Sequence, residues 1–393
     1  MESFDNDLAQ RLDALRGEGL YRELRCVDSA QGPRVQLGGR TLVNFSSNDY
    51  LGLANEPLLK EAAIRAVEKF GSGSGSSRLI SGSLAPHHEL EEALAAFKGS
   101  EAALVFSSGY AAALGVICSL MGRDDVIVVD KLVHACVVDA SRLSGAKLRV
   151  FAHNDLNELE DILKWAAQTR NAEGGTRNSS RTLVVTESVF SMDGDHAPLR
   201  EILSLKEKFG AWLMVDEAHA TGLYGTNRRG LAESLGVSDR IEIQMGTLGK
   251  ALGASGGYIC GSRLLVELLV NKARSFIFST APVPAAAAAA AAGVRFVQSA
   301  AGAERCTQLW DRVVSAPVAG PRSAILPLMV GDEARAVELA ASLRGQGVFI
   351  PAIRYPAVAR GRARLRLTVT AAHTDADLEE LGAALAATGV RAT

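Results

Sequence analysis

Seven short apolar segments alternate with helix-like stretches between residues 46 and 290, and this alternation is the strongest constraint on the fold. The segments read AALVF, DVIVVD, KLRVF, TLVVTE, WLMVD, IEIQM and GGYIC. Runs of this length, apolar on both faces and separated by helical patterns, are typical of a mostly parallel sheet with helices on both sides. We therefore predict one large α/β domain with a seven-stranded sheet over residues 46–290.

The two ends of the chain predict smaller units. Residues 1–45 read as a helix and a short hairpin, an arm too small to fold alone. Residues 291–393 combine helical patterns with short strands, which indicates a small α+β domain with its own core. The expected helices are 5–17, 333–346 and 375–387, and the expected C-terminal strands are 324–330, 348–350 and 363–370.

Three segments of biased composition lie between these elements. The alanine run 285–292 predicts a closely packed helix, and residues 166–181 predict a solvated connection. The Gly/Ser-rich stretch 71–83 is compatible with an ordered active-site loop or with a flexible surface loop.

Charge and cysteine content narrow the functional classes. The net charge of −2 leaves no basic surface for a nucleic-acid partner. The five cysteines are scattered and form no CxxC pair, which argues against structural zinc and disulfides and favours a reducing cytoplasm. The acidic, amphipathic N-terminus lacks the apolar core of a signal peptide, and no membrane association is expected.

Lys250 and Asp216 are the two residues that most directly indicate chemistry. Lys250 lies in the Gly-rich string GTLGKALGASGG, and Asp216 ends the apolar run WLMVD. Pyridoxal phosphate (PLP) chemistry needs a lysine that forms an imine with the cofactor aldehyde and an acid that keeps the pyridine nitrogen protonated. An acid at the end of a strand is also often a helix cap, so the pair needs support from other positions.

Further candidates follow neighbouring strands. His134 comes after DVIVVD, where an imidazole can stack on the pyridine ring, and His219 could reach the phenolic oxygen. Gly109 and Tyr110 begin a helix after AALVF, and the free N–H groups of a helix start suit a phosphate. Thr247 adds a hydroxyl one turn before the lysine. A single histidine is more often structural than catalytic. The functional roles of His134 and His219 are therefore supported only by their positions after strand ends.

Two short motifs suggest other functions but lack their partners. Residues 216–219 spell the DEAH of helicases, yet the chain has no GxxxxGK[ST] loop, and Ala251 follows the lysine where that loop needs a hydroxyl. Gly71, Gly73 and Gly75 follow no strand and do not match GxGxxG. An ATPase and a dinucleotide-binding fold are therefore not supported.

Seven longer strings are shared with one group of enzymes: FSSNDYLGL, FAHNDL, FSMDGDHAPL, VDEAHATG, TLGKALGASGG, FSTAPVP and ARLRLTVTAAH. Through them the chain resembles the α-oxoamine synthase family of PLP-dependent enzymes nearly end to end. The resemblance implies the aspartate-aminotransferase-like fold (fold type I), a homodimer, and a decarboxylating condensation of an amino acid with an acyl thioester. ARLRLTVTAAH, following AIRYPAV, favours the branch that joins L-alanine to pimeloyl-CoA or pimeloyl-acyl carrier protein in biotin biosynthesis.

The resemblance also implies residue roles. The catalytic residues would be Lys250 as cofactor-binding lysine and base, His134 over the ring, and Asp216 on its nitrogen. The remaining cofactor contacts would be Gly109, Tyr110, Ser191, His219 and Thr247, with Ser279 and Thr280 reaching the phosphate from a second subunit. The substrate contacts would be Asn48 and Arg366 on the amino-acid carboxylate, His134 on the acyl carbonyl, and Arg22 on the acyl group. Ala357 stands where relatives often have a threonine, which removes a hydroxyl contact to the acyl chain.

Other functions use parts of the same machinery. Glycine C-acetyltransferase and 5-aminolevulinate synthase would use glycine in place of alanine, and a PLP transaminase or lyase would release no thiol. A PLP-binding regulator would need an additional partner domain, and the predicted elements leave no residues for one.

Overall fold

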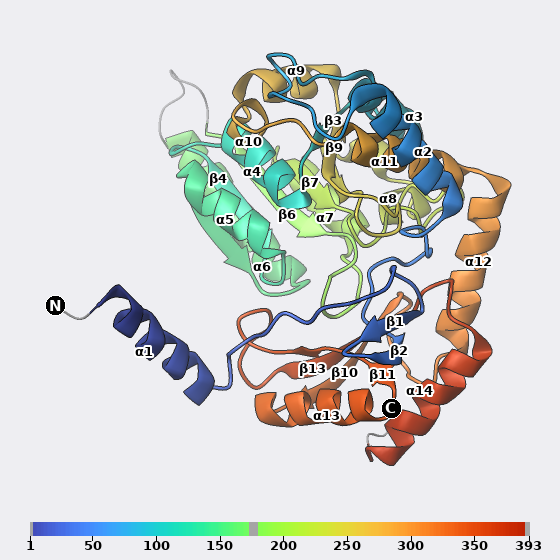
Figure 1. Ribbon diagram of the computed structural model, residues 1–393. Coiled ribbons are helices and arrows are strands. Elements are labelled where there is room, and N and C mark those ends of the chain that lie inside the picture. Colours follow the sequence, from blue (N-terminus) through green and yellow to red (C-terminus); the bar gives the residue numbers. More distant parts are fainter. Residues whose placement is uncertain (1–2, 173–179, 390–393) are drawn as a thin grey trace. The chain divides into compact units, whose positions relative to one another are not determined.

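The computed structural model describes residues 3–172 and 180–389 (Figure 1). Two compact units are present. The larger contains Leu51–Ser191 and Asp195–Thr307, and the smaller contains Met1–Tyr50, Met192–Gly194 and Gln308–Thr393.

These units divide the chain differently from the three predicted segments. The N-terminal hairpin of β1 (Arg34–Leu37) and β2 (Arg40–Asn44) belongs to the smaller unit, because β2 pairs in parallel with β11 (Val348–Phe349). The predicted alanine-rich helix, α11 (Pro284–Gln298), belongs to the larger unit, where it packs against α2 and α3. The domain boundary therefore follows packing partners that are distant in sequence.

The larger unit is built on the predicted seven-stranded sheet, in the order β3-β9-β8-β7-β6-β4-β5. All pairs are parallel except those that β9 makes with β3 and β8. The strands are β3 (Ala102–Phe106), β4 (Val126–Asp130), β5 (Lys147–Phe151), β6 (Thr182–Glu187), β7 (Trp212–Asp216), β8 (Ile243–Thr247) and β9 (Gly257–Gly261). The prediction of a mostly parallel α/β sheet is confirmed.

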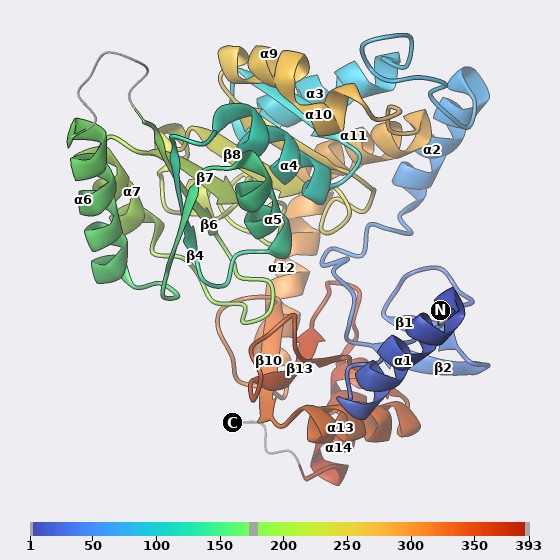
Figure 2. The same cartoon turned by 90° about the vertical axis from the view of Figure 1, so that its left-hand side faces the viewer.

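Helices cover both faces of this sheet. Figure 2 shows α6 (Leu156–Ala172) and α7 (Leu199–Lys208) on one face and α4 (Gly109–Leu120) and α5 (Ala135–Ser144) on the other. Every residue of β4 and β6 is buried, so these strands have no solvent-facing side and read as continuous apolar runs. The remaining helices of this unit are α2 (Pro57–Phe70), α3 (Ala85–Lys98), α8 (Leu231–Ser234), α9 (Arg263–Lys272) and α10 (Arg274–Ile277), with a 3-10 turn at Ser238–Arg240.

One predicted loop was wrong in part. Residues 166–172 belong to α6 and do not form a solvated connection, since the helix that begins at Leu156 continues to Ala172 and Ala166 is buried. Of the rest of that predicted connection, residues 173–179 lie outside the described residues, and residues 180 and 181 are in neither helix nor strand.

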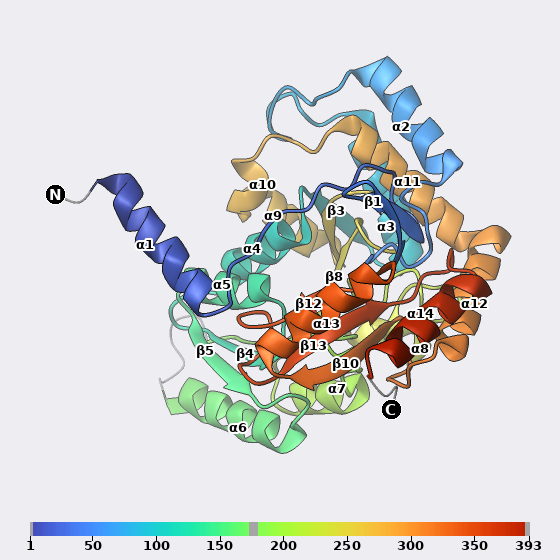
Figure 3. The ribbon, with the colours of Figure 1, turned by 60° about the horizontal axis from the view of Figure 1, so that its bottom comes forward.

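The smaller unit has its own sheets and helices. An antiparallel sheet has the order β10-β13-β12, and α13 packs along it (Figure 3). The predicted helices are confirmed to within about a residue at each end. The elements are α1 (Phe4–Gly17), β10 (Ile325–Gly331), α13 (Glu333–Gly345), β12 (Ala352–Ile353), β13 (Ala363–Thr368) and α14 (Asp375–Ala387). Helix α12 (Ala300–Ser315) contains the boundary between the two units.

In residues 3–172 and 180–389, no helix is both long enough and apolar enough to pass through a lipid bilayer.

Candidate active site

A cavity of ≈ 210 Å³ lies in the larger unit at the carboxyl ends of the central strands. Parallel strands bring their carboxyl ends to one edge, which is where ligands bind in open α/β sheets. Eight of the ten residues predicted to contact the cofactor line this one cavity. They are Gly109, Tyr110, His134, Ser191, Asp216, His219, Thr247 and Lys250.

Lys250 lies three residues beyond the end of β8, in a glycine-rich turn. Its Nζ donates a hydrogen bond of 3.0 Å to Thr247 Oγ1. The turn closes through a bond from the Gly253 N–H to the Lys250 carbonyl at 2.9 Å. Gly253 has φ of 67°, and a Cβ there would lie 2.5 Å from Leu53 Cβ, so the turn requires glycine. The amine is therefore held in the cavity by a rigid local structure.

Asp216 ends β7, and its side chain is buried. Its Oδ1 accepts a hydrogen bond of 2.9 Å from the Ala218 N–H. Burial raises the pKa of Asp216, and the charges of Lys250 and His134 act in the opposite direction. A cationic N–H group in the cavity would stabilise the charge of this buried carboxylate. A protonated pyridine ring presents such a group.

The start of α4 forms an anion cradle on the same cavity. Ser108 caps the helix and accepts a bond of 3.1 Å from the Ala111 N–H. The N–H groups of Gly109 and Tyr110 come before it, at the helix end where N–H groups have no partner within the helix. A Cβ on Gly109 would lie only 2.7 Å from Thr247 Cγ2, so glycine allows the helix start and Thr247 to meet. This arrangement fits a phosphate group.

His134 caps α5 at the wall of the cavity. Its Nδ1 accepts from the Cys136 N–H at 3.3 Å. Since Nδ1 is an acceptor, a neutral ring carries its proton on Nε2, which leaves that N–H to donate elsewhere. The ring itself is exposed in this chain, and burial raises the pKa of the Cys136 thiol beneath it.

Glu187 is a cavity residue that the sequence analysis missed. It ends β6 directly opposite Asp216 in the strand register, and it is buried. Its Oε2 accepts from the Ser191 N–H at 3.1 Å, whereas Oε1 has no hydrogen-bond partner among the described residues. Burial, then the charge of Asp216, raises the pKa of Glu187 to about 8. The available signal was that TLVVTE ends in a glutamate just as WLMVD ends in an aspartate. Both acids therefore stand at the carboxyl ends of their strands.

The loop that carries Ser191 is tied to the β4 end by His153. Its Nδ1 lies 2.9 Å from Asp130 Oδ1, and its Nε2 lies 2.7 Å from Asp195 Oδ2. Phe190 contacts the ring edge-on at 4.4 Å. Burial lowers the pKa of His153, but hydrogen bonds to the two carboxylates outweigh it and raise the pKa to about 10. A protonated imidazole therefore joins FAHNDL to FSMDGDHAPL, two of the strings that carried the resemblance.

Glu217 and His219, which complete the DEAH tetrapeptide, lie in the turn after β7. Glu217 is buried and forms an ion pair of 2.5 Å with Lys98, which also donates to the Arg229 carbonyl at 2.6 Å. Its other oxygen accepts from the Ala232 N–H at 2.9 Å. The acid thus anchors residues 229–232 beneath the turn, and His219 is held buried at the cavity wall.

Ser279 and Thr280 are not part of this cavity lining. They follow α10, and Thr280 pairs with Ser77 in an isolated antiparallel bridge. Ser74 Oγ also donates to the Pro282 carbonyl at 2.6 Å, which fastens the Gly/Ser-rich stretch 71–83 to the same segment. Their predicted contact with the phosphate of a second subunit stays a prediction.

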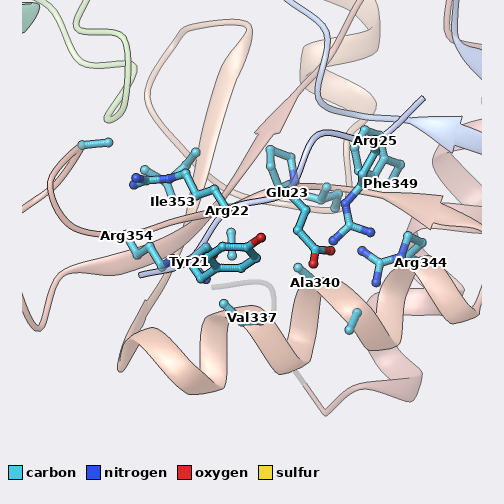
Figure 4. A pocket seen from close by; sticks show the side chains of 15 residues that line it. Tyr21, Arg22, Glu23, Arg25, Val337, Ala340, Arg344, Phe349, Ile353 and Arg354 are labelled. Carbon is cyan, nitrogen blue, oxygen red and sulfur yellow. The ribbon is translucent and has the colours of Figure 1, made fainter. Parts of the chain in front are cut away.

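The predicted substrate residues Asn48, Arg366 and Arg22 belong to the smaller unit. Arg366 is buried on β13 and its Nη2 lies 3.5 Å from the Tyr50 hydroxyl, which lies 3.3 Å from Asn48 Oδ1. Asn48 and Arg366 therefore share Tyr50 as a neighbour. Arg22 lines a separate cavity (Figure 4), and Ala357 belongs to the lining of the same cavity.

This fold, with a lysine and an acid from neighbouring strand ends in one cavity, defines the class of PLP-dependent transferases of fold type I. The chain belongs to the aminotransferase class I and II family, which matches it over residues 40–385.

Individual relatives narrow the comparison. The chain is 47% identical to an 8-amino-7-oxononanoate synthase from Geotalea daltonii, over 97% of each protein. It is 50% identical to the enzyme of the same name from an Anaeromyxobacter species, over 96% of this chain and 94% of the relative.

Two solved structures show the same fold. A serine palmitoyltransferase from S. paucimobilis, solved with a PLP–myriocin adduct, superposes with a TM-score of 0.88 at 30% identity, over 98% of each chain. An 8-amino-7-oxononanoate synthase from Francisella tularensis superposes with a TM-score of 0.73 at 26% identity, over 88% of this chain and 98% of that one.

Proposed function

We propose that this chain is a PLP-dependent acyltransferase that condenses L-alanine with a pimeloyl thioester. The products are 8-amino-7-oxononanoate, carbon dioxide and free thiol, in biotin biosynthesis. The observation that carries the proposal is the placement of Lys250 and Asp216 in one cavity. Its support is the full-length identity of 47% to a relative with that name.

The cavity residues suit pyridoxal phosphate at each of its polar groups. When bound, the cofactor draws electrons from the amino acid and makes its α-proton acidic. Asp216 would stabilise the protonated ring nitrogen, and His219 would donate to the phenolic oxygen. The N–H groups of Gly109 and Tyr110 would hold the phosphate, with the Thr247 hydroxyl beside them.

Lys250 moves the proton in the chemical step. Its amine accepts the α-proton of bound alanine, and the Thr247 hydroxyl, 3.0 Å away, orients it. Arg366 and Asn48 would hold the alanine carboxylate and so fix the direction of its α C–H bond.

His134 acts on the second substrate. Its Nε2–H donates to the thioester carbonyl and stabilises the negative charge that develops there. A C–C bond forms between the alanine α-carbon and this carbonyl, and the C–S bond breaks to release the thiol. The alanine carboxylate then leaves as carbon dioxide, because it stands β to the new ketone, and the protonated Lys250 amine returns a proton to the same carbon. Arg22 contacts the acyl group.

The assembly and location are part of the same proposal. Helix α1 has no buried residue and exposes Phe4, Leu8, Leu12 and Leu15, a stripe that a second subunit would cover in a homodimer. Ser279 and Thr280 would then reach the partner's phosphate. The five free cysteines support a reducing, cytoplasmic location.

Thiol release with defined substrate pairs tests the function. L-alanine with pimeloyl-CoA should release thiol fastest, and glycine with acetyl-CoA or succinyl-CoA should release it slowly. Faster release with glycine would assign the chain to glycine C-acetyltransferase or 5-aminolevulinate synthase. Amine transfer to a keto acid without thiol release would contradict the acyltransferase and favour a transaminase.

A further inference from the structure

A second cavity, of ≈ 600 Å³, lies wholly within the smaller unit (Figure 4). Its floor is apolar and comes from α13 and from the segment 349–353, with Val337, Ala340 and Phe349 among its residues. Its polar lining is unusual, because four guanidinium groups stand against the single carboxylate of Glu23. In a chain with a net charge of −2, this concentration of positive charge favours an anionic ligand with an apolar part.

The four arginines form two pairs at opposite ends of the cavity (Figure 4). Arg22 and Arg354 form one pair, and both are used in holding the cavity wall. Arg354 Nη2 donates to the Tyr21 carbonyl at 2.6 Å, and Arg22 Nη2 donates to the Tyr355 carbonyl at 3.1 Å. These bonds join residues 21–22 to the loop after β12, so this pair already has a structural role.

Arg25 and Arg344 form the other pair, which differs from the first pair in its hydrogen bonding. Neither side chain forms a hydrogen bond or an ion pair with another of the residues that the structure describes, although the Arg344 carbonyl accepts a backbone bond from the Gly347 N–H at 3.2 Å. Burial, and then the charge of Arg25, lowers the pKa of Arg344. Arg344 lies in the last turn of α13, where the helix dipole favours a cation. The helix end does not explain why Arg25, from a segment that is not helical, places a second guanidinium beside it. The Glu23 carboxylate lies near this pair in the cavity (Figure 4) but forms no ion pair with either guanidinium among the described residues, so the two positive charges favour an anion between them.

A third cavity approaches the same pair from its other side. This cavity, of ≈ 350 Å³, is lined by Arg25 and Arg344 together with Arg40 and Asp28. Arg40 donates a hydrogen bond of 3.0 Å to the Gly345 carbonyl at the C-terminal end of α13. The positive charge that this helix end favours is therefore supplied by Arg40, and Arg344 is not needed for it. The Arg25–Arg344 pair therefore lines two cavities.

We infer that the Arg25–Arg344 pair binds the phosphate of a phosphopantetheine arm whose pantetheine chain lies along the apolar floor of the cavity. A carboxylate typically pairs with one guanidinium group through two parallel hydrogen bonds. A phosphate group has more acceptor oxygens and therefore suits two guanidinium groups better than a carboxylate does. The inference rests on the proposed function, since both possible acyl donors, coenzyme A and acyl carrier protein, carry this arm. It assigns the recognition of that shared group to two arginines of the smaller unit.

Equilibrium binding to the PLP-loaded enzyme tests the inference without turnover. The probes are 4′-phosphopantetheine, pantetheine without the phosphate, 3′,5′-ADP and pimelate. Arg25→Gln and Arg344→Gln should each weaken 4′-phosphopantetheine binding by about tenfold, because each removes hydrogen bonds to a charged group. Neither should change pantetheine binding. Arg344→Lys, which keeps the charge and loses the fork, should fall between the wild type and Arg344→Gln.

Arg335→Gln is the matched control, because Arg335 lies on the same helix, faces Glu338 and is not in the cavity lining. It should bind every probe like the wild type, and the thermal midpoint of each variant shows whether it is folded. Competition by 3′,5′-ADP that is lost in Arg344→Gln would place the nucleotide of coenzyme A on the pair and overturn the assignment to the arm. Unchanged 4′-phosphopantetheine binding in the Arg25→Gln/Arg344→Gln double variant, or loss of pimelate binding alone, would also overturn it.

The outcome is separable from that of the proposed function. If alanine and pimeloyl-CoA release no thiol but the arginine variants lose 4′-phosphopantetheine, the arm site stands and the reaction is wrong. If thiol is released and the variants bind the arm normally, the reaction stands and the arm site is wrong.

Discussion

Glu187 and Asp216 stand directly opposite each other at the ends of β6 and β7, and both carboxyl groups are buried. Ionising two adjacent buried carboxyl groups is unfavourable, because each charge is desolvated and the two charges repel each other. One of the two groups therefore keeps its proton near neutral pH. Lys250 favours the charged form of both acids, and we assign the proton to Glu187, because burial and the charge of Asp216 raise its pKa to about 8, above neutral pH. Asp216 is thereby kept as the anion that a pyridinium nitrogen needs.

The shared proton predicts an effect of pH on stability. Glu187 has a pKa of about 8 in the folded chain, against an ordinary value of 4.5. Between these values the folded state holds a proton that the unfolded state has lost, so unfolding free energy falls as pH rises through this window. Glu187→Gln removes this dependence and keeps an oxygen for the Ser191 N–H. Relative to wild type, the variant should gain stability from about pH 5 to about pH 8 in urea unfolding. A difference that is constant with pH would contradict the assignment.

His153 should have a pH dependence in the same direction, in a higher pH window. Its pKa is raised from 6.5 to about 10, so its contribution is complete below 6.5 and is lost as pH rises through 10. His153→Gln should lower the unfolding free energy by about 2 kcal/mol at neutral pH, since it removes two charge-assisted hydrogen bonds of a partly exposed ring. The difference between wild type and variant should shrink between about pH 6.5 and about pH 10. If it stays the same across that range, the ring is neutral and the bridge has been misassigned.

Lys98 and Glu217 predict a strongly non-additive pair of variants. Lys98→Met leaves the buried Glu217 carboxylate without its cation and should destabilise the chain by about 3–5 kcal/mol. Lys98→Met combined with Glu217→Gln should recover part of this loss, because no uncompensated charge remains. A double-mutant cycle on urea unfolding measures the coupling. Additive losses would show that the ion pair of 2.5 Å contributes little.

Gly109 and Thr247 predict a steric effect on cofactor binding. In Gly109→Ala the new Cβ would lie 2.7 Å from Thr247 Cγ2, which forces the helix start away from the phosphate. The dissociation constant of pyridoxal phosphate should rise at least about tenfold, a change of ~1.4 kcal/mol. Thr247→Ser removes Cγ2 and keeps the hydroxyl, so Gly109→Ala/Thr247→Ser should recover much of the affinity. Equal affinities in the single and double variants would mean that the contact is not the cause. Cofactor fluorescence during titration provides the measurement.

The features that the sequence predicted well are those that depend on local pattern. The strands of the large sheet are short apolar runs such as VIVVD, and parallel topology alone places His134, Asp216 and Lys250 at one edge. Features that depend on distant partners were not predictable. The pairing of β2 with β11 joins residues about 300 positions apart, and no local signal indicates it. Glu187 was missed because a terminal glutamate on a strand is informative only when its neighbour in the sheet is known.

The proposed reaction depends on removal of the α-proton of alanine by Lys250. The most direct measurement is exchange of the α-hydrogen of L-alanine in heavy water, followed by NMR with no acyl donor present. The PLP-loaded enzyme should exchange it, and Lys250→Ala supplied with the same cofactor should lose both the exchange and the visible absorption of the lysine-bound cofactor. Exchange that continues in Lys250→Ala at the wild-type rate would contradict the account.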